Sequence, residues 1–85
     1  MNIWDNFLKL FNLYDGYYEN DRKHGYGEFD WPDGRKYSGY YKDGKQEGIG
    51  IYVSSSGETK YGNWSQGKRL EWITEEVYNE RKAAM

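Results

Sequence analysis

The stretch YSGYYKDGKQEGIG, residues 37–50, contains four glycines within a sequence that otherwise favours β-strands. Tyrosine and isoleucine are typical of strands, whereas glycine weakens a strand because it has no side chain to pack. Successive side chains point to opposite faces of a strand, so Tyr37, Gly39 and Tyr41 share one face. We therefore predict that large aromatic rings lie over bare glycine backbone on one face of a sheet.

The same arrangement recurs along the chain. Gly16, Gly39 and Gly62 stand 23 residues apart, and aromatic residues keep the same spacing. A fixed period of this length is typical of a supersecondary unit that stacks on its neighbours. The sequence therefore predicts repeated units rather than one irregular domain.

Each unit contains two predicted strands. In the second strand of one unit, Gly48, Gly50 and Tyr52 share a face, so we expect rings over both glycines. The segments WPDGR (31–35) and SSSGE (54–58) have the proline, aspartate, serine and glycine residues that turns require. The predicted fold is mainly β, an antiparallel meander of β-hairpins.

These residues resemble the MORN repeat, whose pattern is Tyr-x-Gly-x-(Trp/Tyr)-x-x-Gly-x-x-x-Gly-x-Gly. Residues 37–50 match it at every position, and residues 14–27 depart from it only at Asp21, where glycine is usual. A third unit has Lys60 in place of tyrosine and reads Glu-Trp-Ile at 71–73 in place of Gly-x-Gly. We therefore expect the hairpin of this unit to be incomplete. The resemblance covers about residues 14–70 and implies an elongated sheet of hairpins, which we expect to extend over residues 14–73.

The two ends of the chain are predicted to be helical. Over residues 1–13, apolar side chains that include Trp4, Phe7 and Phe11 recur at helical spacing and form one face of an amphipathic helix. Over residues 74–85, Thr74 is a suitable N-cap, and acidic residues follow it in the first turn. We expect both helices to cap the sheet, with docking into a partner groove as the alternative for the first.

Composition excludes several classes of protein. A formal net charge of -2 argues against a dedicated nucleic-acid binder. The absence of cysteine excludes disulfides and thiolate metal sites. The first residues are interrupted by Asp5 and Lys9 and are not a plausible signal peptide, so we expect an intracellular protein whose compartment the sequence does not name.

Residue types that carry catalysis are sparse. His24 is the one histidine in the chain, and the carboxylates fall mostly at turns and strand edges. This distribution provides no nucleophile with a base and no acid–base pair. We therefore expect no enzymatic activity, no catalytic residues, no metal, no cofactor and no small-molecule substrate.

The face opposite the rings differs between the two matched units. In the second unit it is apolar, whereas the first unit has charged residues there, so a terminal helix or another protein must cover the apolar patch. We predict that this patch contacts a partner together with Trp72 or the first helix, and the predicted contact residues are Tyr40, Ile49, Ile51, Val53, Trp72, Trp4, Phe7 and Phe11.

A column of cations recurs at the hairpin turns. Arg22, Lys45 and Lys68 occupy equivalent positions, and Lys23 and Arg69 stand beside the outer two. Such a ladder could bind anionic lipid head groups or an acidic partner, as the resemblance also implies. The alternative is a set of solvated turn residues, because acidic residues interleave with the ladder.

The sequence thus favours a non-catalytic interaction or scaffold module. We expect a small accessory subunit of a larger assembly, bound to other proteins in a hetero-oligomer that can lie at a membrane. The alternative is a module that associates peripherally with anionic phospholipid. In proteins with such repeats, the resemblance implies that catalysis resides in separate domains that this sequence does not contain.

Overall fold

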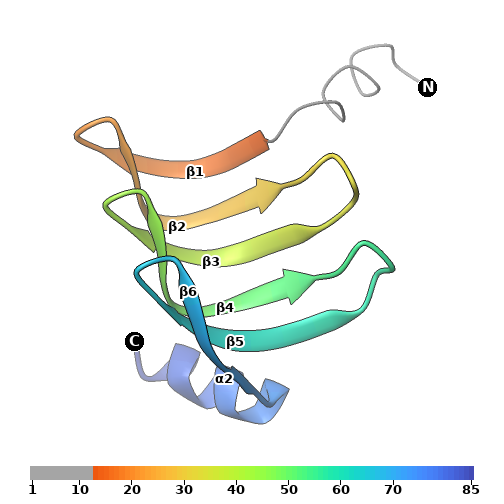
Figure 1. The fold of residues 1–85 in the computed structure, drawn as a ribbon. Coiled ribbons are helices and arrows are strands. Elements are labelled where there is room, and N and C mark those ends of the chain that lie inside the picture. Colours follow the sequence, from red (N-terminus) through yellow and green to blue (C-terminus); the bar gives the residue numbers. More distant parts are fainter. Residues whose placement is uncertain (1–12) are drawn as a thin grey trace.

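The computed structural model describes residues 13–85, which form one six-stranded sheet and a helix (Figure 1). The elements are β1 (Leu13–Glu19), β2 (Arg22–Asp30), β3 (Lys36–Lys42), β4 (Lys45–Val53), β5 (Thr59–Ser65), β6 (Lys68–Ile73) and α2 (Glu75–Ala83). Consecutive strands pair antiparallel in the order β1-β2-β3-β4-β5-β6, which confirms the predicted meander. The helix predicted over residues 1–13 falls almost entirely outside the described residues.

A row of paired glycines crosses the sheet. The pairs that make up this glycine row are Gly16↔Gly27, Gly27↔Gly39, Gly39↔Gly50 and Gly50↔Gly62. The ring of Tyr37 lies over one of these pairs: a Cβ atom added at Gly39 would stand 2.5 Å from the tyrosine oxygen. Tyr14 lies in the same way over Gly16 and Gly27. The predicted packing of rings on glycine is confirmed at these pairs.

Two glycines of the repeat have a different role from the one predicted. Gly25 and Gly48 have φ angles of +79° and +82°, and a Cβ atom at Gly48 would have no neighbour within 4 Å. Between Gly39↔Gly50 and Tyr41↔Gln46 the pairing slips by two residues, so Gly48 lies in a bulge. The expectation of a ring over Gly48 is therefore wrong, because a bulge interrupts strict alternation. Glycine is favoured there because it adopts positive φ without strain.

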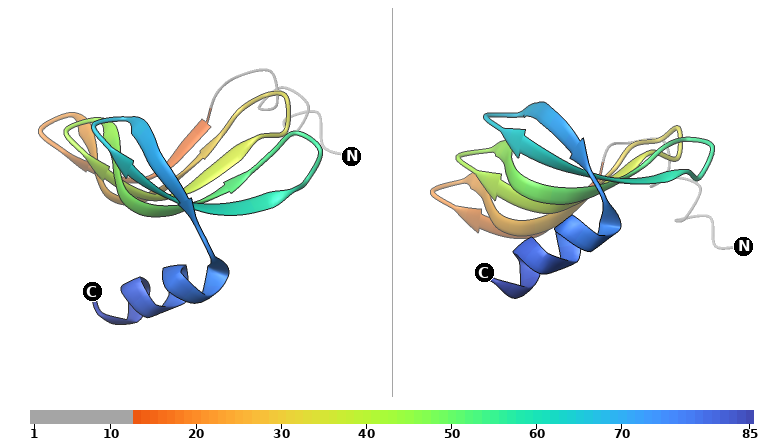
Figure 2. Two further views of the ribbon diagram at one scale, coloured as in Figure 1. Left: turned by 60° about the horizontal axis from the view of Figure 1, so that its bottom comes forward. Right: turned by 90° about the horizontal axis from the view of Figure 1, so that it is seen from below.

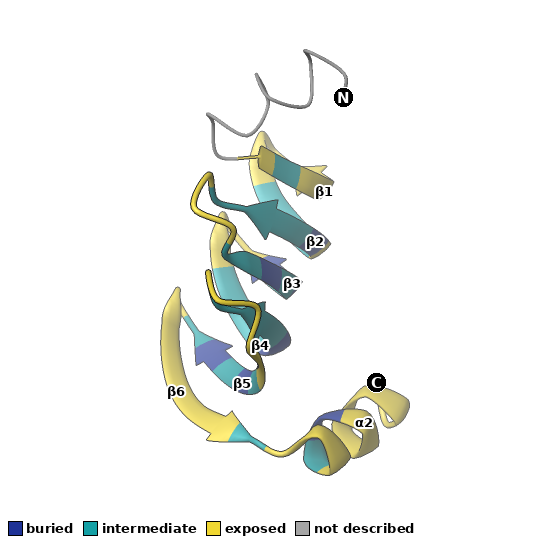
Figure 3. Ribbon diagram, turned by 90° about the vertical axis from the view of Figure 1, so that its right-hand side faces the viewer, coloured by how far each residue is buried: buried dark blue, intermediate teal, exposed yellow. Residues whose placement is uncertain are grey.

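The core lies on the ring face of the central strands. Tyr37 is fully buried, Tyr41 and Trp64 are 6% and 7% exposed, and these three side chains form one cluster. The Tyr37 hydroxyl donates a hydrogen bond of 3.0 Å to the Tyr40 carbonyl oxygen, so the buried phenol has a partner. Figure 3 shows the most buried segments in the middle of the sheet, with β1 and β6 largely exposed at its two edges.

The third hairpin is complete, contrary to prediction. Strand β6 pairs with β5 from Ser65↔Lys68 to Tyr61↔Ile73. Trp72 stands opposite Gly62, where the glycine row would otherwise continue. The ring of Tyr37 on β3 requires bare backbone on the following strand β4, whereas β5 has Lys60 at the equivalent position, so no such ring requires glycine on β6. Backbone hydrogen bonds form the hairpin without it.

Both predicted turns are confirmed. In the turn after β2, the Gly34 amide donates to the Trp31 carbonyl over 3.1 Å, and Gly34 has a φ of +97°. In the turn after β4, the Gly57 amide donates to the Ser54 carbonyl over 2.9 Å. The two loops therefore close in the same way, one repeat apart.

Helix α2 begins after the predicted N-cap. The Thr74 hydroxyl accepts a hydrogen bond of 3.1 Å from the Val77 amide, which satisfies one free N–H of the first turn. Figure 2 shows α2 lying against one face of the curved sheet, while the strands bend away from it at both ends. Tyr78 is 4% exposed, and its ring centroid lies 5.1 Å from that of Tyr61 on β5. This ring fixes the helix to the face opposite the core cluster.

Candidate functional site

The apolar patch of the second repeat lies on the face that α2 covers. Ile49 is 6% exposed, and Arg81 and Met85 from the C-terminal segment line a hollow beside it. Tyr40, Ile51 and Val53 are half-buried. The sequence left open whether a terminal helix or another protein covers this patch. In the structure, the C-terminal segment of the chain itself lies beside Ile49. A partner contact by this patch stays a prediction.

The other residues predicted to contact a partner lie elsewhere. Trp72 lies on the ring face, where its ring centroid is 6.0 Å from that of Tyr52 and 6.1 Å from that of Trp64. It therefore cannot form one continuous surface with Ile49 on the opposite face. Trp4, Phe7 and Phe11 lie outside the described residues.

A continuous series of stacked rings crosses the ring face. Neighbouring rings meet edge to face, with centroids between 5.0 and 6.1 Å apart, in the range favourable for aromatic pairs. This aromatic ladder consists, in order, of Trp72, Trp64, Tyr37, Tyr41, Tyr14 and Tyr18. Its centre is buried, whereas Tyr18 at the β1 end is 61% exposed and Trp72 at the β6 end is 39% exposed.

Two of the five predicted cations stack on this face. The Lys23 ammonium lies 4.5 Å from the ring centroid of Phe29 and 5.1 Å from that of Tyr14. The Arg69 guanidinium lies 4.2 Å from the ring centroid of Trp72. Each cation thus lies within reach of the negative face of a ring. Among the rings of residues 13–85, Lys23 and Arg69 thus stack on an aromatic face, whereas Arg22, Lys45 and Lys68 do not.

An open groove of about 230 Å³ lies where Lys23 meets the aromatic side chains. We call it the aromatic groove, and its lining side chains are Lys23, Phe29, Trp31, Tyr41, Lys45 and Gln46. Phe29 and Trp31 are half-buried, with ring centroids 4.7 Å apart. Phe29 and Trp31 are not among the residues predicted to contact a partner, although Trp31 begins the predicted turn segment and Phe29 shares the ring face of its strand.

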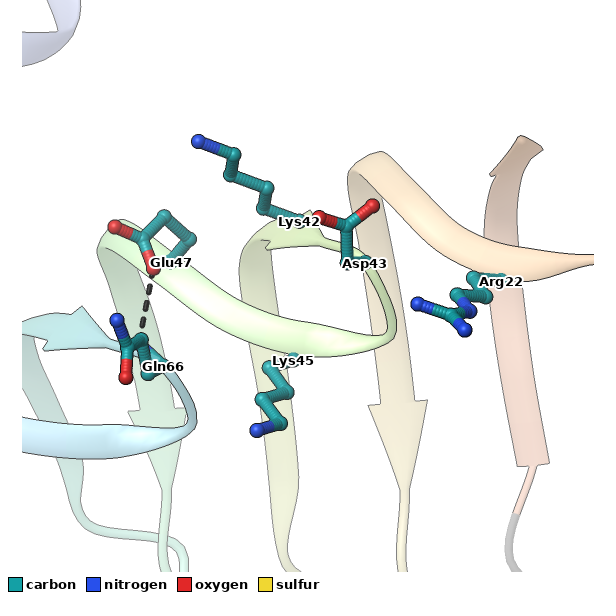
Figure 4. Close-up of a pocket in the computed structure, with 6 residues that line it drawn as sticks. All are labelled: Arg22, Lys42, Asp43, Lys45, Glu47 and Gln66. Carbon is teal, nitrogen blue, oxygen red and sulfur yellow. Dashed lines mark hydrogen bonds between the residues drawn. The ribbon is translucent and has the colours of Figure 1, made fainter. Parts of the chain in front are cut away.

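A second hollow, of about 390 Å³, lies at the hairpin turns (Figure 4). Both cations and carboxylates line it, and its lining residues are Arg22, Lys42, Asp43, Lys45, Glu47 and Gln66. The Glu47 carboxylate accepts a hydrogen bond of 2.9 Å from the backbone N–H of Gln66. The turn surface is therefore of mixed charge, and Lys68 is exposed beyond this hollow.

Burial changes the acidity of the central phenols. It raises the pKa of Tyr37 well above its ordinary value, and it raises the pKa of Tyr41 to about 12, with the nearby Tyr14 adding to the effect. Both phenols are therefore neutral at physiological pH. They can pack and donate hydrogen bonds but are not bases there.

Residues 13–85 contain neither a metal-binding cluster nor a helix that could span a membrane. Histidine, aspartate and glutamate side chains of this part of the chain do not gather in threes that could hold a metal ion. His24 instead lies with its Nε2 atom 3.2 Å from the Glu19 carboxylate. No helix in the same residues is both long and apolar enough to span a bilayer.

Comparison with known proteins agrees with the repeat geometry. The sequence model of the MORN repeat matches residues 14–34 and 37–59, which together make up more than half of the chain. These two segments correspond to the hairpins β1–β2 and β3–β4 with the turns that follow them. No curated protein matches the sequence. The chain belongs to the MORN repeat family.

Proposed function

We propose that this chain is a non-catalytic, intracellular protein-interaction module that binds a segment of another protein in the aromatic groove. In this role it would be a scaffold or small accessory subunit of a hetero-oligomeric assembly. MORN repeats are generally involved in interactions with proteins and membranes, which supports the class of function. The choice of the groove depends on the geometry of this chain.

The observation that supports the proposal most is the chemistry of the groove. Phe29 and Trp31 offer half-exposed rings, which can bury apolar side chains of a partner. Lys23 and Lys45 border these rings, and neither forms an ion pair with a carboxylate among residues 13–85. The groove therefore suits an extended protein segment that carries apolar and acidic side chains.

Cross-linking mass spectrometry of the natively purified protein tests this proposal. Amine-reactive cross-links to another protein should concentrate on Lys23 and Lys45, because both border the groove, and should be fewer on Lys82 of α2. A chain that is free of other proteins in cells would contradict the proposal. Cross-links spread evenly over all exposed lysines would contradict the assignment to the groove.

A matched pair of variants adds a control. Lys45 and Lys68 are equivalent in the repeat and both exposed, but only Lys45 lines the aromatic groove. Lys45→Glu should therefore weaken partner binding by about tenfold or more, since it opposes acidic side chains of the partner. Lys68→Glu changes the net charge equally and should leave binding nearly unchanged.

The turn cations support a second candidate, peripheral binding to anionic membranes. The Gly44 amide donates to the Lys23 carbonyl, and the Gly67 amide to the Gln46 carbonyl, both over 2.9 Å. These bonds hold successive turns side by side, so Arg22, Lys45 and Lys68 emerge along one edge. Sedimentation with phosphatidylserine vesicles at physiological salt separates the candidates. Membrane binding predicts equal loss in Lys45→Glu and Lys68→Glu, whereas no sedimentation excludes it.

A further inference from the structure

We propose that two copies of this chain associate through strand β1, pairing antiparallel about Gly16 to form one continuous sheet. Within residues 13–85, β1 is the first strand of the sheet and pairs only with β2. Tyr17 and Tyr18 on this strand are 71% and 61% exposed, the former on the face opposite the rings. An edge strand with unpaired backbone groups is a template for another strand.

The glycine row defines the register of this association. Every strand pair from β1 to β5 places glycine opposite glycine, and the row ends in the described chain at Gly16. Antiparallel pairing about Gly16 places this residue opposite Gly16 of the second copy, so the row continues across the junction. In the same register Tyr14 lies opposite Tyr18 of the second copy, and the exposed end of the aromatic ladder meets its counterpart.

The acidic residues of β1 select the same register. Pairing about Gly16 places Asp15 opposite Tyr17 and Leu13 opposite Glu19, so like charges do not face each other. The two smallest shifts that keep the ring face continuous centre the pairing on Asp15 or on Tyr17. The first shift opposes Asp15 to Asp15, and the second opposes it to Glu19. Like charges directly opposite each other destabilise a strand pair, so both shifts are disfavoured.

The other end of the sheet differs from the β1 end. There Trp72 takes the place of the next glycine, and its ring packs on Trp64. Helix α2 follows β6 directly and lies against β4 and β5. The glycine row therefore continues at one edge only. A two-fold contact through that edge closes after two copies and does not grow into a fibre.

Sedimentation velocity over a concentration series tests the association with the full chain. One short strand pair buries less surface than a stable interface, so we expect dimers to appear between roughly 1 μM and 1 mM. A chain that stays monomeric over this whole range would overturn the proposal.

Two substitutions at one exposed position test the register. Tyr17→Asp places a carboxylate opposite Asp15 twice in the symmetric dimer, and should weaken dimerisation about tenfold. Tyr17→Lys removes the same ring but places a cation opposite Asp15, and should weaken dimerisation less than Tyr17→Asp or strengthen it. Near-ultraviolet circular dichroism shows whether each variant is folded. Equal effects of the two substitutions would overturn the Gly16-centred register.

Hydrogen–deuterium exchange identifies the strand that pairs. The outward amides of β1 should exchange more slowly as the protein concentration rises, while the amides of β6 should not change. Protection of β1 that is already complete in the monomer would mean that the chain's own residues 1–12 cover this edge. That result would also overturn the proposal.

Discussion

The ring of Tyr37 lies across its own strand onto Gly50 of the neighbouring strand, so that a Cβ atom on Gly50 would stand 2.6 Å from Tyr37 Cε2. Real Cβ atoms essentially never approach another atom so closely. The ring is fully buried, so it cannot move aside without disturbing its neighbours Tyr41 and Trp64. The fold therefore requires glycine at this position for its missing side chain and not for its φ angle.

Gly50→Ala should consequently destabilise the protein by about 1–3 kcal/mol, the usual range for overpacking a core. Urea unfolding followed by tryptophan fluorescence measures the change. The matched control is the same substitution in a Tyr37→Leu background, where the smaller side chain leaves room for the methyl group. There Gly50→Ala should cost less, or stabilise by up to about 1 kcal/mol, because alanine suits a strand better than glycine. Equal costs in both backgrounds would contradict the packing of Tyr37 on Gly50.

The Tyr37 hydroxyl should contribute separately from its ring. Tyr37→Phe keeps the ring but removes the hydrogen bond to the Tyr40 carbonyl, and should cost about 1–2 kcal/mol of unfolding free energy. Tyr17→Phe is the control, because Tyr17 is 71% exposed and its change should lie within about 0.5 kcal/mol. If Tyr37→Phe leaves the unfolding free energy unchanged, the hydrogen bond to the Tyr40 carbonyl oxygen does not contribute as expected, because water replaces the Tyr37 hydroxyl as its donor.

The buried phenols make stability depend on pH in the alkaline range. Burial raises the pKa of Tyr41 to about 12 and that of Tyr37 further, whereas an unfolded tyrosine titrates at about 10. The folded protein holds these protons more tightly, so the stabilisation is complete below about pH 10 and is lost as pH rises through about 12. Each phenol should lower the unfolding free energy by about 1.4 kcal/mol per pH unit in this window.

Urea midpoints measured at several pH values between about 9 and 12 check this slope. Tyr41→Phe removes one of the two most strongly shifted phenols and should reduce the slope by about 1.4 kcal/mol per pH unit, whereas Tyr14 and Tyr78, whose pKa burial also raises, keep their contributions. An unchanged slope in this variant would assign the alkaline unfolding to other groups.

The spacing of the glycines and tyrosines was sufficient to predict the strands, the turns and the face that carries the rings. It was not sufficient to separate two kinds of glycine. Gly50 and Gly48 lie two residues apart on one strand. Gly50 lies under the ring of Tyr37, whereas Gly48 has a positive φ in a bulge. A bulge depends on how two strands pair, and a period of two along one strand contains no information about it.

The sequence pattern was likewise not sufficient to predict the third hairpin or the aromatic groove. Strand β6 lacks the glycines of the repeat but still forms, because backbone pairing with β5 does not require them. Lys23 and Lys45 were grouped from the sequence by their place at the turns. The structure instead joins them through Phe29 and Trp31, a grouping that depends on which face each side chain takes after the bulge.

Helix α2 should depend on its single buried anchor. Tyr78 is 4% exposed and packs on Tyr61, so Tyr78→Ala should release the helix from the sheet and raise amide exchange throughout α2. The amides of β3 and β4 should remain protected from exchange, because the core rings lie on the face of the sheet opposite α2. Glu80→Gln, on the exposed part of the helix and outside its first turn, is the control and should leave the exchange of α2 nearly unchanged.

The most direct test of the central claim, that rings lie over the glycine row, is the chemical shift of the Gly50 α-protons in solution. We expect the Tyr37 ring current to shift them upfield, both protons to show nuclear Overhauser contacts to this ring, and Tyr37→Leu to abolish both effects. Gly50 α-protons at ordinary strand positions, without contacts to the ring in the folded protein, would contradict this claim.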